Sequence, residues 1–397
     1  MAHCQLAGLV PMNQHYTTDF PTHYPSHDRP THAEINLDAL RKNYSLIKKL
    51  AGSARIMAMV KAEAYGHGLI PISRTLSGLG VDYLGVSFLE EGVALREAGL
   101  DTPILVMGGL VDEQIERYLE YDIEITVSSA WKGKQAESAA IKLGKKAKIQ
   151  IKIDTGMGRV GNQWNTAEPF FQAISKLKHT EITGIYSHFA CSDSLDSHYT
   201  KLQLERFQEI LLVAERYGIR TDLAHIANSG ALLQYTKETR YSMVRPGIML
   251  YGWHPTPELE HLCELHPVMT LKSAVVYVKY PPAGTPIGYG STYMSPGNRW
   301  IATLPIGYGD GYPRRAGNRG FVLINGKRCP IVGRVSMDML TVDCGDQAYL
   351  GDQAVLFGGS GTDSLSLWEL SGLLDTIPYE LTTCLTSRVP RIYLDNC

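Results

Sequence analysis

The feature that most constrains the fold is an alternation of short β-rich runs with amphipathic helical stretches between residues 56 and 247. Eight runs have strand character, and helical periodicity fills most of the intervals between them. In order they are IMAMVK (56–61), YLGVS (83–87), ILVMGG (104–109), IEITVSS (123–129), KIQIKIDT (148–155), ITGIYSH (182–188), DLAHIANS (222–229) and YSMVRPG (241–247). Eight strands that alternate with helices are typical of a (β/α)₈ barrel, whose chemistry lies at the C-terminal ends of its strands. We therefore predict an α/β fold built on a TIM-like barrel.

The sequence changes character on both sides of this region. After about residue 266, runs such as SAVVYVKY, RWIATLPIGY and QAVLFGG are separated by many Gly and Pro residues, which predicts a mostly-β C-terminal domain. Residues 1–30 are rich in His, Tyr, Thr and Pro and show no period, which predicts a poorly ordered tail. We place the barrel domain at residues 31–266 and the β domain at residues 267–397.

Composition limits the classes of function. A net charge of -2 with 20% charged residues offers no basic surface to nucleic acid or to an acidic membrane. No apolar run approaches the ~20 residues of a membrane span, and the N-terminus lacks a secretory signal pattern. The seven cysteines are odd in number and form no CxxC pair, which favours reduced thiols over disulfides or a zinc site. We expect a cytoplasmic protein without a metal.

The stretch MVKAEAYGHG (59–68) carries a lysine at the end of a hydrophobic run. Lys61 is either an ordinary surface charge or an amine in a cleft, where desolvation lowers its pKa and makes it a nucleophile or base. Asp154, His188, Asn228 and Ser229 also follow strand-like runs. A barrel brings such strand ends together, so we expect these side chains to share one site.

Two further stretches could hold an anionic cofactor. HIANSG (225–230) and SMVRPGIMLYG (242–252) place small residues and backbone N–H groups at Ser229, Gly247 and Ile248, either as a phosphate cradle or as ordinary barrel turns. Arg245 either pairs with a carboxylate or faces a pyridine nitrogen. Because a guanidinium only donates hydrogen bonds, a ring nitrogen opposite it must stay unprotonated.

Nine motifs in one order, from about Thr31 to the end of the chain, carry a family resemblance. They are VKAEAYGHG, KIDTGMGRVG, YSHFA, HIANSG, VRPGIMLYG, YGSTY, LPIGYGDGYPRR, GRVSMDMLTVD and SRVPRIY. With them the chain resembles the alanine racemases, pyridoxal-phosphate enzymes with a barrel and a C-terminal β domain. Accidental agreement of nine ordered motifs is very improbable.

The resemblance implies a cofactor site on the barrel. Lys61 would form the internal Schiff base with pyridoxal 5′-phosphate, Tyr65 would lie near the phosphate, and Leu105 would line the pocket. Asn228, Ser229, Gly247 and Ile248 would complete the phosphate cradle. Arg245 would face the pyridine nitrogen, with His188 nearby.

The resemblance also implies a reaction that interconverts L-alanine and D-alanine and supplies D-alanine for cell-wall peptidoglycan. Two bases on opposite faces suit racemisation: Lys61 would serve the D face and Tyr289 the L face. In the family this tyrosine reaches the cofactor of the other subunit, so a homodimer is implied. The substrate positions would be Arg159, Tyr308, Met337 and Asp338. Lys152 matches a lysine that some members carbamylate, which would orient Arg159.

Three departures from the family pattern leave alternatives open. Glu63 stands where Asn is usual, Ser336 replaces a Cys, and Ser387 replaces a pocket tyrosine of some members. The smaller Ser387 side chain could admit larger substrates, so a serine/alanine racemase of broader specificity is the alternative. A decarboxylase of the same architecture should lack the paired SMDM and YGSTY motifs, and a pyridoxal-phosphate-binding protein could be the barrel alone.

Overall fold

The computed structural model describes residues 29–109, 112–195, 197–220, 222–359 and 364–395. The tail predicted for residues 1–28 lies outside this part of the chain. Arg29, which the prediction counted with the tail, donates hydrogen bonds of 2.7 Å to both carboxylate oxygens of Asp310 in the second domain.

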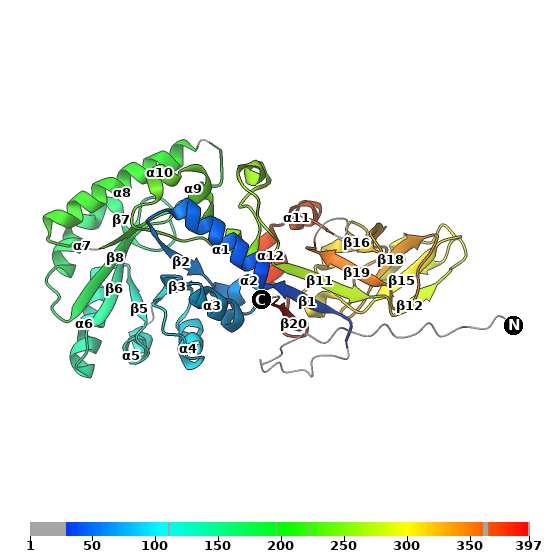
Figure 1. Ribbon diagram of the computed structural model, residues 1–397, viewed down its shortest axis with the longest axis horizontal. Helices are drawn as coiled ribbons and strands as arrows, with labels where there is room; N and C mark the ends of the chain where they lie inside the picture. The colour runs from blue at the N-terminus through cyan, green and yellow to red at the C-terminus, as the bar shows by residue number, and fades with distance from the viewer. Residues whose placement is uncertain (1–28, 110–111, 196, 221, 360–363, 396–397) are drawn as a thin grey trace.

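The eight predicted strands form one parallel sheet that curls into a nearly closed barrel (Figure 1). Its order is β10-β2-β3-β4-β5-β6-β8-β9. Backbone hydrogen bonds from Ser242 N to Ala224 O (3.2 Å) and from Arg245 N to Ala227 O (2.9 Å) link its last strand to its first. The predicted fold class is confirmed. The strands are β2 (Arg55–Met59), β3 (Tyr83–Val86), β4 (Ile104–Val106), β5 (Glu124–Val127), β6 (Ala147–Asp154), β8 (Thr180–Tyr186), β9 (Leu223–His225) and β10 (Met243–Val244), with β7 (Asn162–Gln163) beside β6.

Amphipathic helices surround the barrel, as α1 illustrates. Its apolar residues Leu40, Tyr44 and Ile47 recur at helical spacing and are all buried. Asn36 caps its N-terminus by accepting a hydrogen bond from Ala39 N at 2.9 Å. The helices of this domain are α1 (Leu37–Ala51), α2 (Lys61–Tyr65), α3 (Leu69–Gly78), α4 (Leu89–Glu97), α5 (Ile115–Glu120), α6 (Ala130–Leu143), α7 (Ala167–Ile174), α8 (His198–Arg216), α9 (Ser229–Gln234) and α10 (Thr236–Thr239).

The second domain is mostly β, as predicted. A six-stranded sheet has the order β17-β16-β19-β11-β1-β20, a smaller sheet has the order β12-β15-β18, and β13 pairs with β14. Two helices, α11 (Leu367–Leu374) and α12 (Pro378–Thr383), pack in this domain. The strands are β1 (His32–Asn36), β11 (Met269–Ala274), β12 (Tyr277–Lys279), β13 (Pro286–Ile287), β14 (Tyr293–Met294), β15 (Trp300–Leu304), β16 (Phe321–Ile324), β17 (Lys327–Pro330), β18 (Leu340–Gly345), β19 (Gln353–Phe357) and β20 (Arg391–Leu394).

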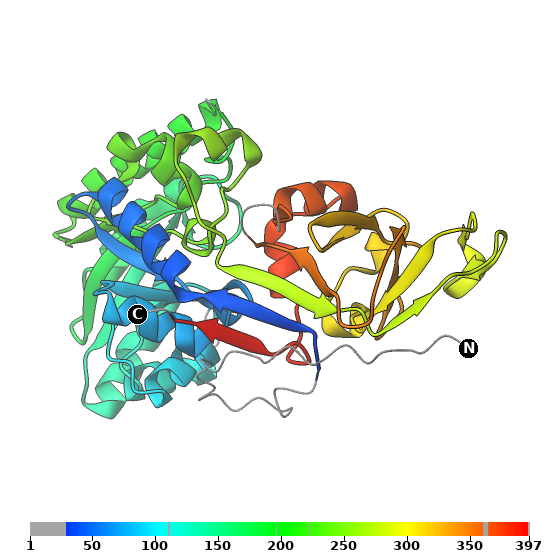
Figure 2. The ribbon, with the colours of Figure 1, turned by 45° about the vertical axis from the view of Figure 1, so that its right-hand side comes forward.

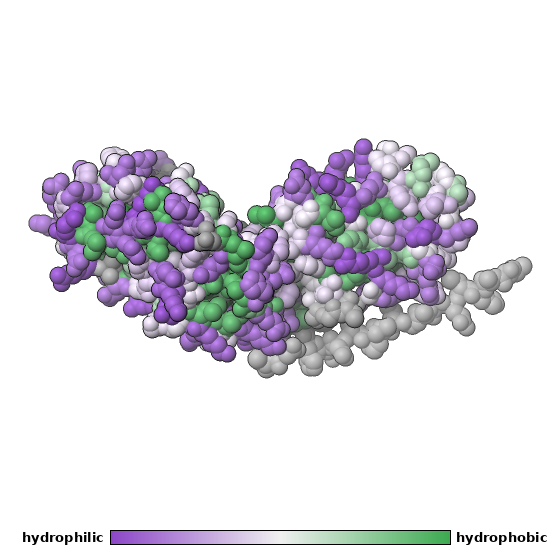
Figure 3. All heavy atoms as spheres, turned by 90° about the horizontal axis from the view of Figure 1, so that it is seen from above, coloured by the Kyte–Doolittle hydropathy of each residue, from purple (hydrophilic) through white to green (hydrophobic). Residues whose placement is uncertain are grey.

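The first described strand departs from the predicted domain boundaries. Residues 31–36 were assigned to the barrel, but β1 pairs antiparallel with β11 and parallel with β20 in the second sheet (Figure 2). Its alternating burial, with Ala33 and Ile35 inside, is that of a strand with one covered face. The domains are thus joined both through β1 and α1 and through the segment before β11. Seen from above, the surface is hollowed between the two lobes (Figure 3).

Candidate active site

A cavity of about 700 Å³ lies at the C-terminal ends of the barrel strands. Polar side chains from β6, β8 and the segments after β2, β9 and β10 line it, which is where a barrel of this type carries its chemistry. Ten of the residues predicted for the site are among those that line the cavity: Lys61, Tyr65, Lys152, Arg159, His188, Asn228, Ser229, Arg245, Gly247 and Ile248.

The other predicted residues lie elsewhere. Leu105 is fully buried on β4 and is not among the described residues that line the cavity, so its contact with a cofactor stays a prediction. Tyr289, Tyr308, Met337 and Asp338 belong to the β domain and are also outside the described lining. The cavity of one chain therefore holds Lys61 without Tyr289.

Lys61 begins a left-handed turn that directly follows β2. The next four residues, 62–65, have φ values of 51°, 54°, 51° and 56°. Such a conformation costs a non-glycine residue roughly 1–2 kcal/mol, so the turn needs support from its surroundings. The carboxylate of Glu91, in α4, accepts hydrogen bonds from Ala62 N (2.6 Å), Ser87 N (2.7 Å) and Phe88 N (3.1 Å). It ties the start of the turn to the loop after β3.

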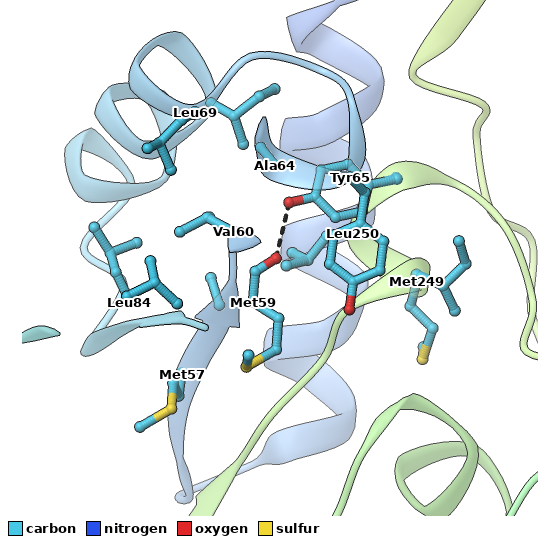
Figure 4. Close-up of a cluster of buried hydrophobic side chains, with 14 of the residues drawn as sticks. Met57, Met59, Val60, Ala64, Tyr65, Leu69, Leu84, Met249 and Leu250 are labelled. Carbon is cyan, nitrogen blue, oxygen red and sulfur yellow. Dashed lines mark hydrogen bonds between the residues drawn. The ribbon is translucent and has the colours of Figure 1, made fainter. Parts of the chain in front are cut away.

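Aromatic packing supports the end of the same turn. Ala64 and Tyr65 are buried beside Met59 and Val60 (Figure 4). The Tyr65 ring stacks on Tyr251 at 4.8 Å between centroids, and Tyr251 Oη donates to Met59 O at 2.8 Å. The left-handed turn is therefore held at both ends, and this fixes the backbone from which the Lys61 side chain enters the cavity.

The electrostatics of the cavity favour a neutral Lys61 amine. Burial lowers the pKa of Lys61, the charge on Arg159 lowers it further, and Glu91 opposes both. An amine with a lowered pKa is a better nucleophile at neutral pH because more of it is unprotonated. This is the property that distinguishes a functional lysine from an ordinary surface charge.

Arg245 is buried on one side of the cavity and is held by four acceptors. Nη1 lies 2.7 Å from His225 Nδ1, while Nη2 donates to Ser187 O (2.8 Å) and Ile226 O (3.1 Å) and lies 3.1 Å from His188 Nδ1. Burial lowers the pKa of Arg245 to about 10, so it stays protonated near neutral pH. Burial and the charge on Arg245 keep the pKa of His188 well below its usual range, so both histidines face the guanidinium as neutral acceptors.

Lys152 is the unusual buried cation of the cavity. Among the described residues its Nζ finds no hydrogen-bond partner, and it lies 4.6 Å above the centroid of the Tyr186 ring. Burial lowers the pKa of Lys152 well below its usual value, and the charges on Arg245 and Arg159 add to the effect. A buried amine without an acceptor is costly, which marks a group that takes part in chemistry or acquires a partner.

The segments after β9 and β10 meet at a small polar pocket. Gly247 N donates to Ser229 Oγ at 3.0 Å, and Asn228 Oδ1 accepts from Ala231 N at 3.0 Å. A Cβ at Gly247 would lie 2.4 Å from Tyr65 Oη, so no side chain fits there. Burial raises the pKa of Tyr65, which keeps its hydroxyl as a donor. The pocket presents the hydroxyl groups of Tyr65 and Ser229 beside a residue without a side chain, a chemistry that suits an anion.

The β domain carries the remaining predicted residues, and two of its loops bring Tyr308 close to Met337 and Asp338. Tyr308 N donates to Ser336 O (3.0 Å) and Gly309 N to Met337 O (2.8 Å), which joins the two loops. Arg388 pairs with Asp338 at 2.7 Å. Tyr289, Met337 and Tyr308 are 72%, 52% and 43% exposed, which leaves three large residues of this domain open to solvent.

Sequence reasoning missed Glu91, His225 and Tyr186 as parts of the site. Glu91 looks like a surface acid of a helix, and only its contact with Ala62, 29 positions earlier, reveals its function. His225 stood in a quoted motif, but its partner Arg245 is distant in sequence. Glu63, the departure from Asn, accepts a hydrogen bond from Leu69 N at 3.1 Å and so caps α3.

No group of three or more His, Cys, Asp or Glu side chains in the described part of the chain is arranged to hold a metal ion. Within the described ranges, no helix is both long and apolar enough to cross a membrane.

Comparison with known families gives two matches that together span the chain. Residues 35–255 match the family model for the alanine racemase N-terminal domain, and residues 268–393 match that for the C-terminal domain. The alanine racemase of Carboxydothermus hydrogenoformans is 42% identical over 369 residues, covering 92% of this chain and 100% of that protein. That of Geobacter sulfurreducens is 39% identical over 92% of this chain and 98% of its own length.

Solved structures agree with the sequence comparison. The alanine racemase of Clostridium difficile 630 superimposes with a TM-score of 0.89 at 35% identity, covering 94% of this chain and 97% of that one. The Bacillus anthracis alanine racemase with bound L-Ala-P gives a TM-score of 0.88 at 34% identity, with coverage of 94% and 97%. Fold and sequence therefore point to the same family.

Proposed function

The chain belongs to the alanine racemase family, and on that premise we propose how its residues interconvert L-alanine and D-alanine with pyridoxal 5′-phosphate. The observation that carries the proposal is the cavity itself, which brings Lys61, Arg245 and the pocket around Gly247 into one place. Each of these groups has a chemistry that a pyridoxal cofactor requires.

The cavity fits the cofactor at three points. The amine of Lys61, with its lowered pKa, suits an imine link to an aldehyde. The pocket formed by Tyr65, Ser229, Asn228 and the open backbone at Gly247 suits a phosphate, since an added Cβ would fill it. Arg245 offers only donors, so it suits an unprotonated ring nitrogen. When bound, pyridoxal 5′-phosphate supplies an electron sink that acidifies the Cα–H bond of the amino acid.

Two bases divide the proton transfer between the faces of the substrate. Lys61 Nζ takes or gives the Cα proton on the D face, because it already lies in the cavity. Tyr289 Oη serves the L face, and the cationic lining of Arg159 and Arg245 favours the deprotonated form of a phenol that enters it. Arg245 limits the electron demand of the ring, which reduces misprotonation at another carbon.

The second base must come from another copy of the chain. Tyr289 is 72% exposed in the β domain, and Met337 of the same domain is 52% exposed. Packing this domain against the barrel of a second subunit would bury exposed residues and deliver Tyr289 to the partner cavity. A two-fold homodimer then carries two shared sites. Arg159, Tyr308, Met337 and Asp338 would bind the amino acid, and the unpartnered Lys152 is a site for carbamylation that would orient Arg159.

The physiological part of the proposal is the supply of D-alanine for peptidoglycan in the cytoplasm. Its support is indirect: the five described cysteines, Cys191, Cys263, Cys329, Cys344 and Cys384, are all free thiols. Free thiols are typical of a reducing compartment.

Broader specificity is the second candidate. Ser387 lies in an exposed turn beside Arg388, which binds Asp338, so the small side chain borders the substrate-binding face. The test is the rate of α-proton exchange and enantiomer conversion for L-alanine and L-serine, measured side by side with pyridoxal 5′-phosphate. A strong preference for alanine supports the narrow racemase, whereas comparable rates support the broad one. Conversion of neither amino acid would refute the proposed function.

A further inference from the structure

A chain of buried polar side chains runs from Arg245 across the barrel interior and ends at Glu124. His225 Nε2 lies 2.7 Å from Gln150 Oε1, and Gln150 Nε2 donates to Glu124 Oε2 at 2.7 Å. Tyr83 Oη donates to Glu124 Oε1 at 3.1 Å, and Thr183 Oγ1 lies 2.7 Å from Oε2. With the 2.7 Å contact between Arg245 and His225, three successive hydrogen bonds link a buried cation to a buried carboxylate.

The donor-to-acceptor direction of these hydrogen bonds is fixed in the same way from both ends. Arg245 can only donate, so His225 Nδ1 must accept and its proton must lie on Nε2. His225 Nε2–H then donates to Gln150 Oε1, which turns the Gln150 amide group toward Glu124. A carboxylate can only accept, so Glu124 requires the same orientation of that amide. One tautomer of His225 and one orientation of Gln150 satisfy both ends.

The barrel makes room for this arrangement. Gln150 and His225 are fully buried, and Glu124 is 4% exposed. A Cβ at Gly184 on β8 would lie 3.0 Å from both Cδ and Oε1 of Gln150, so the glycine leaves space for the amide. The His225 ring also stacks on Tyr186 at 4.9 Å with an interplanar angle of 3°. The ring plane is fixed by stacking, and the tautomer is fixed by the hydrogen bonds.

We propose that Glu124 and Gln150 are positioning residues, which hold His225 in its Nε2–H tautomer and thereby aim Arg245 at the cofactor ring. The proposal deepens the proposed function, because it takes Arg245 as the group that faces the ring nitrogen. Without Gln150, the proton of His225 can move to Nδ1, where it opposes the N–H groups of Arg245. The guanidinium then has to shift from the position that keeps the ring nitrogen unprotonated.

The test is the tautomer of His225 in the full-length holoenzyme. Histidine-labelled protein is sedimented and its ring ¹⁵N signals are recorded by magic-angle-spinning NMR, with His225→Gln used only for assignment. We expect a single neutral Nε2–H form that does not titrate between about pH 6 and 9. In Gln150→Met the His225 signals should show both tautomers or a titration. The same variant should lose about 10- to 100-fold in kcat for L-alanine, the loss typical when a functional imidazole loses its orienting partner, and transaminate more often per turnover.

A matched control separates positioning from general destabilisation. Asn43→Leu removes a buried amide that donates to Leu250 O and His266 O outside the barrel interior, so it should lower stability while leaving the His225 signals unchanged. If Gln150→Met does not fold, Tyr83→Phe and Glu124→Gln perturb the far end with little change in shape and should shift the His225 signals in the same direction.

The outcomes distinguish the two proposals. Unchanged His225 signals, with kcat and the transamination ratio within about twofold of the parent, would overturn the positioning role. A wild-type holoenzyme that racemises no amino acid would instead refute the proposed function, while the NMR measurement would still decide the state of His225.

Discussion

Replacing Glu91 with Gln tests whether one carboxylate holds the left-handed turn that carries Lys61. The carboxylate accepts from three backbone N–H groups, those of Ala62, Ser87 and Phe88. A glutamine of the same shape offers one oxygen, so its NH₂ group must face at least one of these donors. The substitution therefore removes the charge from two hydrogen bonds and replaces the third by a repulsive contact.

The loss in free energy of unfolding can be worked out from these hydrogen bonds. Hydrogen bonds to charged groups contribute ~1.5–3 kcal/mol and neutral ones ~0.5–1.5 kcal/mol, so two weakened bonds cost about 2 kcal/mol. Loss of the third hydrogen bond adds about 1–2 kcal/mol, because solvent reaches part of the carboxylate and reduces the cost. We expect a total near 3 kcal/mol, which is less than the roughly 4–8 kcal/mol of strain in the four left-handed residues. The turn should loosen without unfolding of the barrel.

Calorimetry and kinetics together measure this effect. A loss near 3 kcal/mol should lower Tm by about 4 °C in a chain of this size. Racemisation should fall more than tenfold, because a small displacement of a catalytic group is expensive. Glu90→Gln is the matched control, since Glu90 is an exposed residue of the same helix and accepts a hydrogen bond of 3.4 Å from Gln114 Nε2. A Glu91→Gln protein with the Tm and rate of the Glu90→Gln control would show that the Glu91 carboxylate does not hold the turn.

Three further outcomes are expected. Arg245→Glu should raise the ratio of transamination to racemisation, measured from pyruvate formed per turnover, and an unchanged ratio would contradict the role of the guanidinium. Gly247→Ala should weaken cofactor binding at least about tenfold in reconstitution of the apoenzyme, because its Cβ meets Tyr65 Oη at 2.4 Å; Gly78→Ala, where a Cβ has open space, is the control. Lys152→Met should stabilise the apoenzyme by about 1–3 kcal/mol near neutral pH in carbonate-free buffer, and a lower Tm would contradict this.

The lowered pKa of Lys152 makes the effect of Lys152→Met on stability depend on pH. The pKa of Lys152 is lowered in the folded chain, so below its unfolded pKa the unfolded state binds more protons. Wild-type stability from this group therefore rises with pH up to that unfolded value. The advantage of Lys152→Met should shrink as the pH rises toward about 10, and bicarbonate should narrow it if carbamylation gives Lys152 a partner.

Much of the barrel could be predicted because its information is local. Each strand is a short β-rich run, the helices between them carry a 3.6-residue period, and strand ends in such a fold converge. Lys61, His188 and Ser229 could therefore be placed in one cavity before any coordinates were known. The family motifs added Tyr289 and the residues proposed to bind the substrate.

The features that escaped prediction depend on pairing across long sequence distances. The strand at residues 32–36 lies next to a helix of the barrel in sequence. Its partner on one side is far along the chain, since Met269 opposite Ile35 comes 234 positions later, and its partner on the other side is residues 391–394. Glu91 and Glu124 look like ordinary helix and strand acids, and only the folded chain shows which donors they meet. The left-handed turn also runs against local propensity, because it is held by groups outside itself.

We propose that one chain supplies Lys61 to each active site and that a second chain supplies Tyr289. Lys61→Ala and Tyr289→Phe proteins, each inactive toward L-alanine by itself, should be unfolded, mixed in equal amounts and refolded together. Random pairing makes half of the dimers mixed, and each mixed dimer carries one complete site, so about a quarter of wild-type activity should return. Activity no higher than the sum of the separate variants, in a sample shown by mass spectrometry to contain mixed dimers, would contradict the shared site.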